Sequence, residues 1–328
     1  MRYSTDSHQI SLPGFSYRLI FLLLFSAGFE TFGQQIETNN LNRINTRFQE
    51  IFMENTSTSS FGRDWGAPYK TLLSADLATN FVLFKSAKVG VFFVFTPRIK
   101  AFLFDHPTSV RSPSFLPGAT LYLRENRDIN RPRFFTISYN HHSNGQSGPG
   151  LNPDGTINQK GNFATNFATF KYYQGNVYNR PGQSRSQFYN LGIEAHMALL
   201  NTGYEIHLKN NYGFFRVNGS WTYNILKKQV EGQEDAEMAQ KSNFQRLQVD
   251  FSYIIDTYKS YPLDAAHKRL NMAAKYMYRF NFMDNVAVLL SAGYKGQDDY
   301  NIYFEDSYSY FKVGLISGSG FSDHFRRK

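Results

Sequence analysis

The sequence predicts an all-β protein, a transmembrane antiparallel β-barrel of about 12 strands. Aromatic residues are abundant, with 32 Phe and 22 Tyr among 328 residues, yet the mean hydropathy is slightly negative. Apolar residues must therefore alternate with polar ones, and this pattern suits strands better than helices. Beyond the N-terminal region no stretch approaches the roughly 18 apolar residues of a membrane-spanning helix. A membrane protein built from this chain therefore has to cross the bilayer with strands.

The N-terminal region predicts a signal peptide. Arg18 precedes the apolar run 19–27, and a short stretch ending at Gly33 follows, in the order of charge, apolar core and cleavage site. We expect residues 1–33 to be removed by cleavage near Gly33. Residues 34–328 are then expected to form a single barrel domain in the outer membrane of a Gram-negative bacterium.

The strands are predicted from side chains that alternate between two faces. In residues 246–253, for example, an apolar row runs from Leu247 to Tyr253, and polar residues such as Asp250 fill the row between. Similar patterns predict strands at about 71–84, 88–104, 115–124, 133–144, 162–176, 187–200, 211–226, 243–257, 269–280, 285–296 and 307–317. A twelfth is expected near 47–62, because single-chain bacterial barrels usually close with an even number of strands.

A soluble β-sandwich is the alternative that such alternation leaves open, because its polar face would lie in water. Two features favour the barrel. The apolar rows are long and end in Tyr or Trp, as in a lipid-facing band with aromatic girdles, and the polar rows combine Arg, Lys, Glu and Asp, as a wet lumen does.

Composition narrows the range of functions. The chain has no cysteine, which excludes disulfides and thiolate metal sites. Its formal net charge is +9, and an excess of positive charge attracts anionic lipid headgroups. Because the charges are scattered through strand-like segments, we expect membrane phospholipids and no nucleic acid as partners.

Residues 134–145, with the sequence FFTISYNHHSNG, carry the predicted chemistry. Continuing the apolar row of this segment places His141 and Ser143 on the lipid-facing side, with Cα atoms about 6.6–6.8 Å apart. A serine hydroxyl becomes an effective nucleophile when a base takes its proton, and neutral His suits that role near pH 7. The alternative is that both are ordinary polar residues near the headgroups. His141 and His142 point to opposite faces, so a metal site formed by the two is not expected.

The stretch from Tyr139 to Gly145, YNHHSNG, resembles the YNHxSNG signature of the outer-membrane phospholipase A family. That family consists of twelve-stranded barrels whose active site lies on the outer wall. The resemblance implies that His141 is the base and Ser143 the nucleophile of a phospholipase, a carboxylic ester hydrolase. It also implies that an Asn on the next strand orients the His.

The orienting residue is predicted to be Asn166. The family's second motif, SRSWNR, corresponds to residues 162–167, which keep the last Asn but not the preceding Ser. Asn166 falls in the row opposite Lys171, so if Lys171 faces the lumen, Asn166 faces lipid. Asn190, which follows a Ser-Arg-Ser run, is the other candidate, but it falls on a polar row.

The resemblance further implies Ca2+, held by oxygen atoms of the loop after the catalytic strand, where it stabilises the oxyanion. By position, Gln146 would offer its backbone oxygen and Asn162 would replace the family's serine. The loop 145–161 is longer than in the family. Because the family is controlled through dimerisation, we also expect a possible homodimer.

Two other functions remain open. Lipid A deacylases are smaller barrels that share an HxSN motif but orient the His with a Glu, and this sequence has no Glu between Ser143 and Glu194. The chain could also be a catalytically silent barrel or pore, and the missing serine at position 162 favours that alternative.

Overall fold

The computed structural model describes residues 57–61, 65–67, 71–86, 88–104, 114–158, 161–180, 183–197, 208–227, 244–280, 282–283, 286–298 and 304–317. These residues belong to one compact unit, 41–328. The predicted signal peptide and its cleavage site lie outside the described residues, so that prediction is not tested. Among the described residues, no helix has the length and apolar character needed to cross a membrane.

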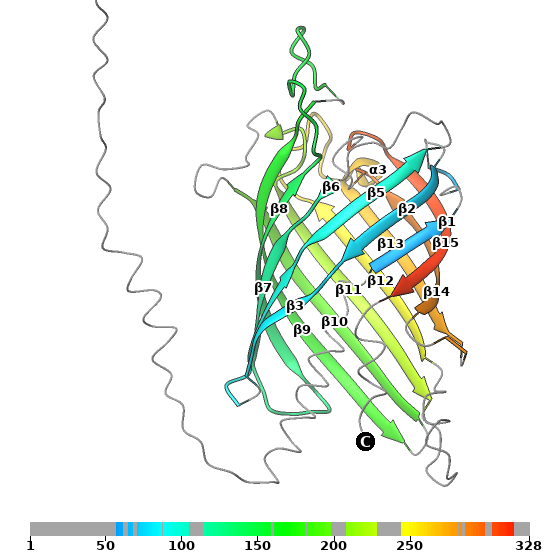
Figure 1. Ribbon diagram of the computed structural model, residues 1–328. Coiled ribbons are helices and arrows are strands. Elements are labelled where there is room, and N and C mark those ends of the chain that lie inside the picture. The colour runs from blue at the N-terminus through cyan, green and yellow to red at the C-terminus, as the bar shows by residue number, and fades with distance from the viewer. Residues whose placement is uncertain are drawn as a thin grey trace, which may run out of the picture. The chain divides into compact units, whose positions relative to one another are not determined.

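Fifteen strand segments of the described chain form a single antiparallel sheet (Figure 1). They are β1 (Ser57–Phe61), β2 (Thr71–Ala78), β3 (Phe81–Ser86), β4 (Val91–Thr96), β5 (Arg98–Phe104), β6 (Ser114–Phe115), β7 (Gly118–Arg124), β8 (Arg133–Ser143), β9 (Ala164–Arg180), β10 (Gln183–His196), β11 (Phe215–Lys227), β12 (Phe244–Ile254), β13 (Leu270–Arg279), β14 (Val286–Lys295) and β15 (Tyr308–Ser317), with the short helix α3 (Ala266–Arg269) before β13.

These segments make a closed barrel of twelve strands, as predicted. Three strands are interrupted, so that β2 with β3, β4 with β5, and β6 with β7 each run as one strand. Two of the interruptions fall at Pro97 and Pro117, because proline has no N–H to donate to the ladder. The carbonyl of Pro117 still accepts from the N–H of His141 at 2.9 Å. The barrel closes where β1 pairs with β15.

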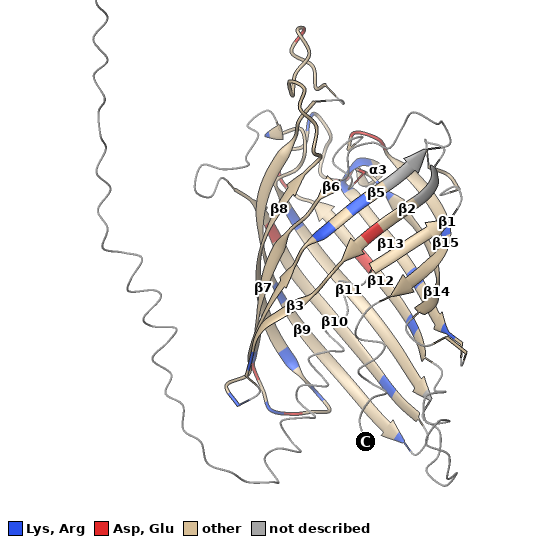
Figure 2. Cartoon of the chain, viewed as in Figure 1, with Lys and Arg blue, Asp and Glu red and all other residues tan. Residues whose placement is uncertain are grey.

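The wall has an apolar outer face. Outward side chains are exposed, among them Leu191 at 59% and Ile137 at 49%, whereas inward Thr136 and Asn190 are buried. Figure 2 shows that charged residues are sparse along most of the strands. Apolar side chains facing outward from a closed sheet are the arrangement of a barrel that spans a lipid bilayer.

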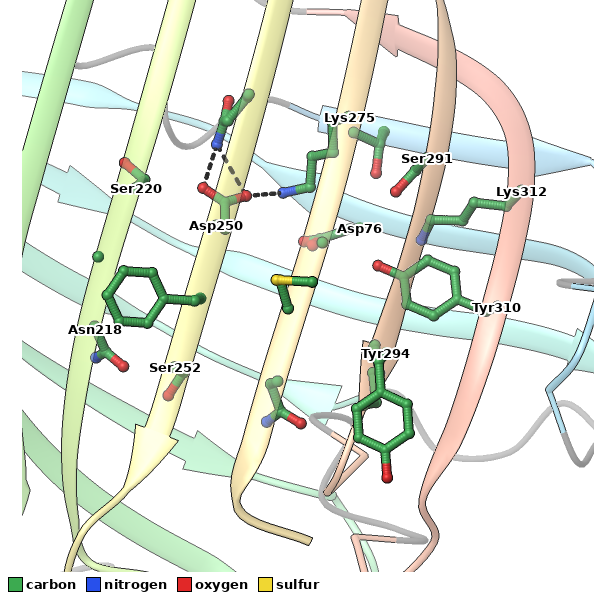
Figure 3. A pocket seen from close by; sticks show the side chains of 18 of the residues that line it. Asp76, Asn218, Ser220, Asp250, Ser252, Lys275, Ser291, Tyr294, Tyr310 and Lys312 are labelled. Atoms are coloured by element: carbon green, nitrogen blue, oxygen red, sulfur yellow. Dashed lines mark hydrogen bonds and ion pairs between the residues drawn. The ribbon is translucent and has the colours of Figure 1, made fainter. Parts of the chain in front are cut away.

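The lumen contains both charged and apolar side chains. Ion pairs lie there, including Lys275–Asp250 at 2.7 Å and Arg98 with Asp76, around a cavity of about 390 Å³ (Figure 3). Other inward side chains form apolar clusters: Phe92, Val94, Tyr122, Phe134, Tyr173, Val177 and Phe188 make one, and Phe163, Leu208, Tyr212 and Phe304 another. The expectation of a wet lumen along the polar rows therefore holds only in part, because side chains fill much of a barrel this narrow.

Candidate active site

The register between β8 and β9 brings His141 directly opposite Asn166. Directly opposed residues have Cβ atoms about 4.5–5.5 Å apart, within reach of a side-chain hydrogen bond. Nδ1 of His141 lies 2.8 Å from Oδ1 of Asn166. An amide oxygen only accepts, so Nδ1–H donates, and in the neutral ring Nε2 is left free to accept a proton. This hydrogen bond therefore fixes the tautomer that a general base requires.

Ser143 stands two residues further along the same outward row. Its cross-strand partners are Ala164 of β9 and Phe115 of β6. Within the described part of the chain, no hydrogen bond joins Ser143 to His141. Hydrogen bonds between a nucleophile and its base are often long in substrate-free sites and shorten when substrate binds.

The pair lies on the lipid-facing wall. Ile137, in the row of His141, is 49% exposed, and Phe170, in the row of Asn166, is 45% exposed. Lys171 of β9 lines the interior cavity instead, as the alternation requires. Asn190, the other candidate, is also buried on the inner side, where it contacts Ser220. Of these two candidates, Asn166 is the one that contacts His141.

Small side chains lie on either side of Tyr139, the residue that precedes His141 in the outward row. Ala119 of β7 and Ala168 of β9 flank Tyr139, and Ala195 of β10 follows Ala168. Because these side chains are short, the wall beside His141 is lower than the wall made by Phe170 and its bulky neighbours.

His142 points the opposite way. Its Nε2 lies 2.7 Å from the hydroxyl of Ser114, and its Nδ1 lies 3.4 Å from the hydroxyl of Tyr212. His141 and His142 therefore contact separate groups on opposite faces and are not joint ligands of one ion. Across the described residues, no group of three or more His, Cys, Asp or Glu side chains gathers as a metal site.

Asn144 organises the connection that follows the site. It is fully buried; its Nδ2 donates to the carbonyl of Gly161 at 2.7 Å, and its Oδ1 accepts from the N–H of Phe163 at 3.0 Å and of Gln146 at 3.3 Å. The sequence motif alone did not predict this role for Asn144. The Asn144–Gly145 pair was the available signal, because Asn followed by Gly at positive φ (61°) marks a turn.

The two predicted calcium ligands both lie at the base of this connection. Two hydrogen bonds join the segment around Gln146 to the segment around Asn162. Oδ1 of Asn144 accepts from the N–H of Phe163, and the N–H of Asn162 donates to the carbonyl of Gly148 at 2.9 Å. Backbone and amide oxygens suit a hard cation such as calcium. Asp154, further out on the connection, is bonded within its own turn to Thr156, and these hydrogen bonds lower the pKa of its carboxyl group.

Taken together, fold and geometry define a membrane-type β-barrel with a His–Asn pair and a neighbouring serine on its outer wall. No family model matches the sequence, and no curated protein matches it either.

Among solved structures, the chain is similar to the outer membrane phospholipase A from Escherichia coli, with 11% identity, a TM-score of 0.48, and coverage of 80% of this chain and 95% of that one. It is also similar to the Salmonella typhi outer membrane phospholipase dimer with bound calcium, with 11% identity, a TM-score of 0.48 and coverage of 81% and 91%. The NanC porin follows at 7% identity, a TM-score of 0.39 and coverage of 80% and 99%. Likenesses at such low identity concern the fold alone.

Proposed function

We propose that this protein is an outer-membrane phospholipase A that hydrolyses acyl esters of glycerophospholipids. The observation that carries the proposal is the 2.8 Å contact between Nδ1 of His141 and Oδ1 of Asn166 on the lipid-facing wall, with Ser143 in the same row. A lipid-facing site suits a substrate that never has to leave the bilayer.

In the proposed reaction, Oγ of Ser143 attacks the carbonyl carbon of the ester while Nε2 of His141 takes the hydroxyl proton. His141 then gives this proton to the departing alcohol oxygen, and the lysophospholipid leaves an acyl-serine behind. A water molecule, deprotonated by His141, attacks the acyl-serine; the bond to Oγ of Ser143 breaks, His141 returns the proton to Oγ, and the fatty acid leaves. Asn166 holds the imidazole in the required orientation, as a carboxylate does in other triads, but adds no charge to stabilise the imidazolium.

The proposal includes calcium, which Gln146 and Asn162 would hold through oxygen atoms at the base of the 144–163 connection. When bound, the cation would stabilise the negative charge that develops on the ester oxygen. The homodimer rests on the motif resemblance and is proposed on that basis.

The apolar outer wall supports a place in the outer membrane, reached after cleavage near Gly33. Connections 144–163, 197–214, 255–269 and 296–307 share the end of the barrel near the site. Apart from 228–243, the connections at the other end are shorter. Bacterial barrels carry their longer loops outside the cell, so the site is proposed to lie toward the outer leaflet.

Two alternatives are less well supported. The Glu that a lipid A deacylase would need is not at His141, because Glu194 faces the lumen and contacts His196 at 2.9 Å. A pore needs a continuous water path, whereas large aromatic side chains occupy the inner rows on either side of the charged middle.

Fatty-acid release from phosphatidylcholine in detergent micelles tests the proposal. We expect Ser143→Ala to lower the rate by at least about a thousandfold, because nothing else in the site can form the acyl intermediate. Ser309→Ala is the matched control, since Ser309 is an exposed serine on β15, and it should retain full activity.

Calcium is tested in the same assay by chelation and re-addition, which should abolish and restore release. If well-folded wild-type protein releases no fatty acid, even as a crosslinked dimer, the phospholipase proposal is wrong. A silent barrel or a different lipid substrate would then be the better explanation.

A further inference from the structure

A catalytic pair works only when it stays within about 0.5 Å of its productive geometry. Asn166, which is 3% exposed, is held by protein and in turn orients His141. The directions of both side chains therefore depend on the backbone of β8 and β9 that carries them. The opposite face of that backbone is the lumen.

The lumenal neighbours of the pair are His142 and Thr165, each one residue along the chain from its catalytic counterpart. They are cross-strand partners of each other, and they are only 4% and 0% exposed. His142 is held by Ser114 at 2.7 Å and by Tyr212 at 3.4 Å. The inner face of the β8–β9 pair is thus anchored directly behind the site.

Thr165 is held through a hydroxyl–imidazole–carboxylate chain. Its Oγ1 lies 2.9 Å from Nδ1 of His196, and Nε2 of His196 lies 2.9 Å from Oε1 of Glu194. A carboxylate only accepts, so Nε2–H donates to Glu194, Nδ1 of the neutral ring accepts, and the hydroxyl of Thr165 donates to it. Thr165 is fully buried, so this chain of groups cannot reach a substrate itself.

The far end of this chain of groups is fixed to the neighbouring strand β11. Asn218 donates to Oε2 of Glu194 at 2.9 Å, and Arg216 lies 3.6 Å from Oε1. Arg216 also donates to the carbonyl of Tyr212 at 2.8 Å, and the Tyr212 ring packs edge-on against His196 with centroids 5.5 Å apart. The contacts therefore return to His142 and form a closed network behind the catalytic pair.

A second contact links this network to the site. The N–H of Met197, the residue after His196, donates to the backbone carbonyl of Asn166 at 2.9 Å. His196 and Met197 together fix β9 at Thr165 and Asn166, one through a side chain and the other through the backbone.

We propose that Thr165 and His196 are positioning residues that set the direction of Asn166, and through it of His141, from the lumenal side. The expected change in kcat rests on the proposed function. The expected change in the direction of His141 does not. Fully satisfied buried networks hold their members in one geometry, and removal of the Thr165 hydroxyl takes away the side-chain contact that fixes β9 behind Asn166.

Thr165→Val tests this inference, because valine has the shape of threonine without the hydroxyl. We expect kcat for phosphatidylcholine to fall about tenfold with KM changed less than about twofold, since the outer wall that meets the lipid is unaltered. Thr165→Ser keeps the hydroxyl and should restore most of kcat. Thr169→Val is the matched control. Thr169 lies two lumenal positions further along β9 and bonds to Ser138, so this variant removes a similar buried contact away from the site.

The Nδ1–H signal of His141 in ¹⁵N-histidine-labelled protein gives a readout that does not need activity. His141→Gln assigns the signal, and Asn166→Ala shows its position when the hydrogen bond is lost. We expect Thr165→Val to move the signal toward that position and Thr169→Val to leave it unchanged. If Thr165→Val fails to fold, His196→Phe replaces it, because phenylalanine keeps a ring at this position but offers Thr165 no acceptor.

A Thr165→Val protein whose His141 signal matches wild type would overturn the inference, whatever its activity. Equal shifts in Thr165→Val and Thr169→Val would also overturn it, because they would show a general loosening of β9. Inactive wild-type protein would defeat the proposed function, while the signal would still decide whether Thr165 and His196 position the pair.

Discussion

At the scale of single residues, the central contact is between an imidazole and a neutral amide. Asn166 is 3% exposed, and its Oδ1 is 2.8 Å from Nδ1 of His141. A carboxylate at the same place would be an ion on a lipid-facing wall, which is strongly unfavourable without a partner. The amide supplies orientation and avoids that desolvation.

This division of roles predicts the behaviour of Asn166→Ala. The imidazole would lose its fixed tautomer but keep its basicity, so we expect kcat for phosphatidylcholine to fall about ten- to a hundredfold, less than for Ser143→Ala. Asn190→Ala removes an amide from the lumenal row and should leave kcat within about twofold. Similar losses in both variants would mean that Asn166 acts through barrel stability and does not orient His141.

At the scale of elements, β8 and β9 carry the catalytic pair on their outer face and the residues that hold it, His142 and Thr165, on their lumenal face. Asn144 stabilises the connection between the two strands. The side chain of Asn144 bonds to three backbone groups of that connection. Loss of these contacts would leave the buried N–H of Phe163 without its partner, at a cost of about 1–3 kcal/mol.

We therefore expect Asn144→Ala to loosen the connection without unfolding the barrel. Limited proteolysis should cut within 145–161 sooner, and half-maximal activity should require several-fold more calcium. Ser147→Ala changes an exposed residue of the same connection and serves as the control. An unchanged calcium requirement with faster proteolysis would separate Asn144 from the proposed cation site.

The outer rows of β7, β9 and β10 lead to a second prediction at this scale. The short side chains of Ala119, Ala168 and Ala195 leave room for an acyl chain on either side of Tyr139, the residue that precedes His141 in the outward row. Ala168→Trp should therefore slow hydrolysis of long-chain phosphatidylcholine at least about tenfold. Ala274→Trp makes the same change on an exposed position of β13 and should have little effect; equal slowing by both would point to a disturbed barrel.

At the scale of the whole molecule, the sequence predicted the number of strands and most of their limits, because outward rows repeat with a period of two residues. The same two-residue alternation predicted that Asn166 lies on the outward face. The interruptions at Pro97 and Pro117 were not predicted, and the contact of Thr165 with His196 could not be. That contact depends on the register between β9 and β10, where side chains 31 residues apart meet, and local alternation does not encode the register between strands.

The interior leads to the last prediction. Ion pairs such as Lys275–Asp250 occupy the middle of the lumen, and large inward side chains, Phe134 and Phe163 among them, are fully buried on either side of it. A barrel filled in this way should not conduct ions. In planar lipid bilayers we therefore expect wild-type protein to give no stepwise current, while a porin inserted under the same conditions does. Regular current steps from protein shown to be inserted would favour the pore alternative, and with it a barrel whose His141 and Ser143 are catalytically silent.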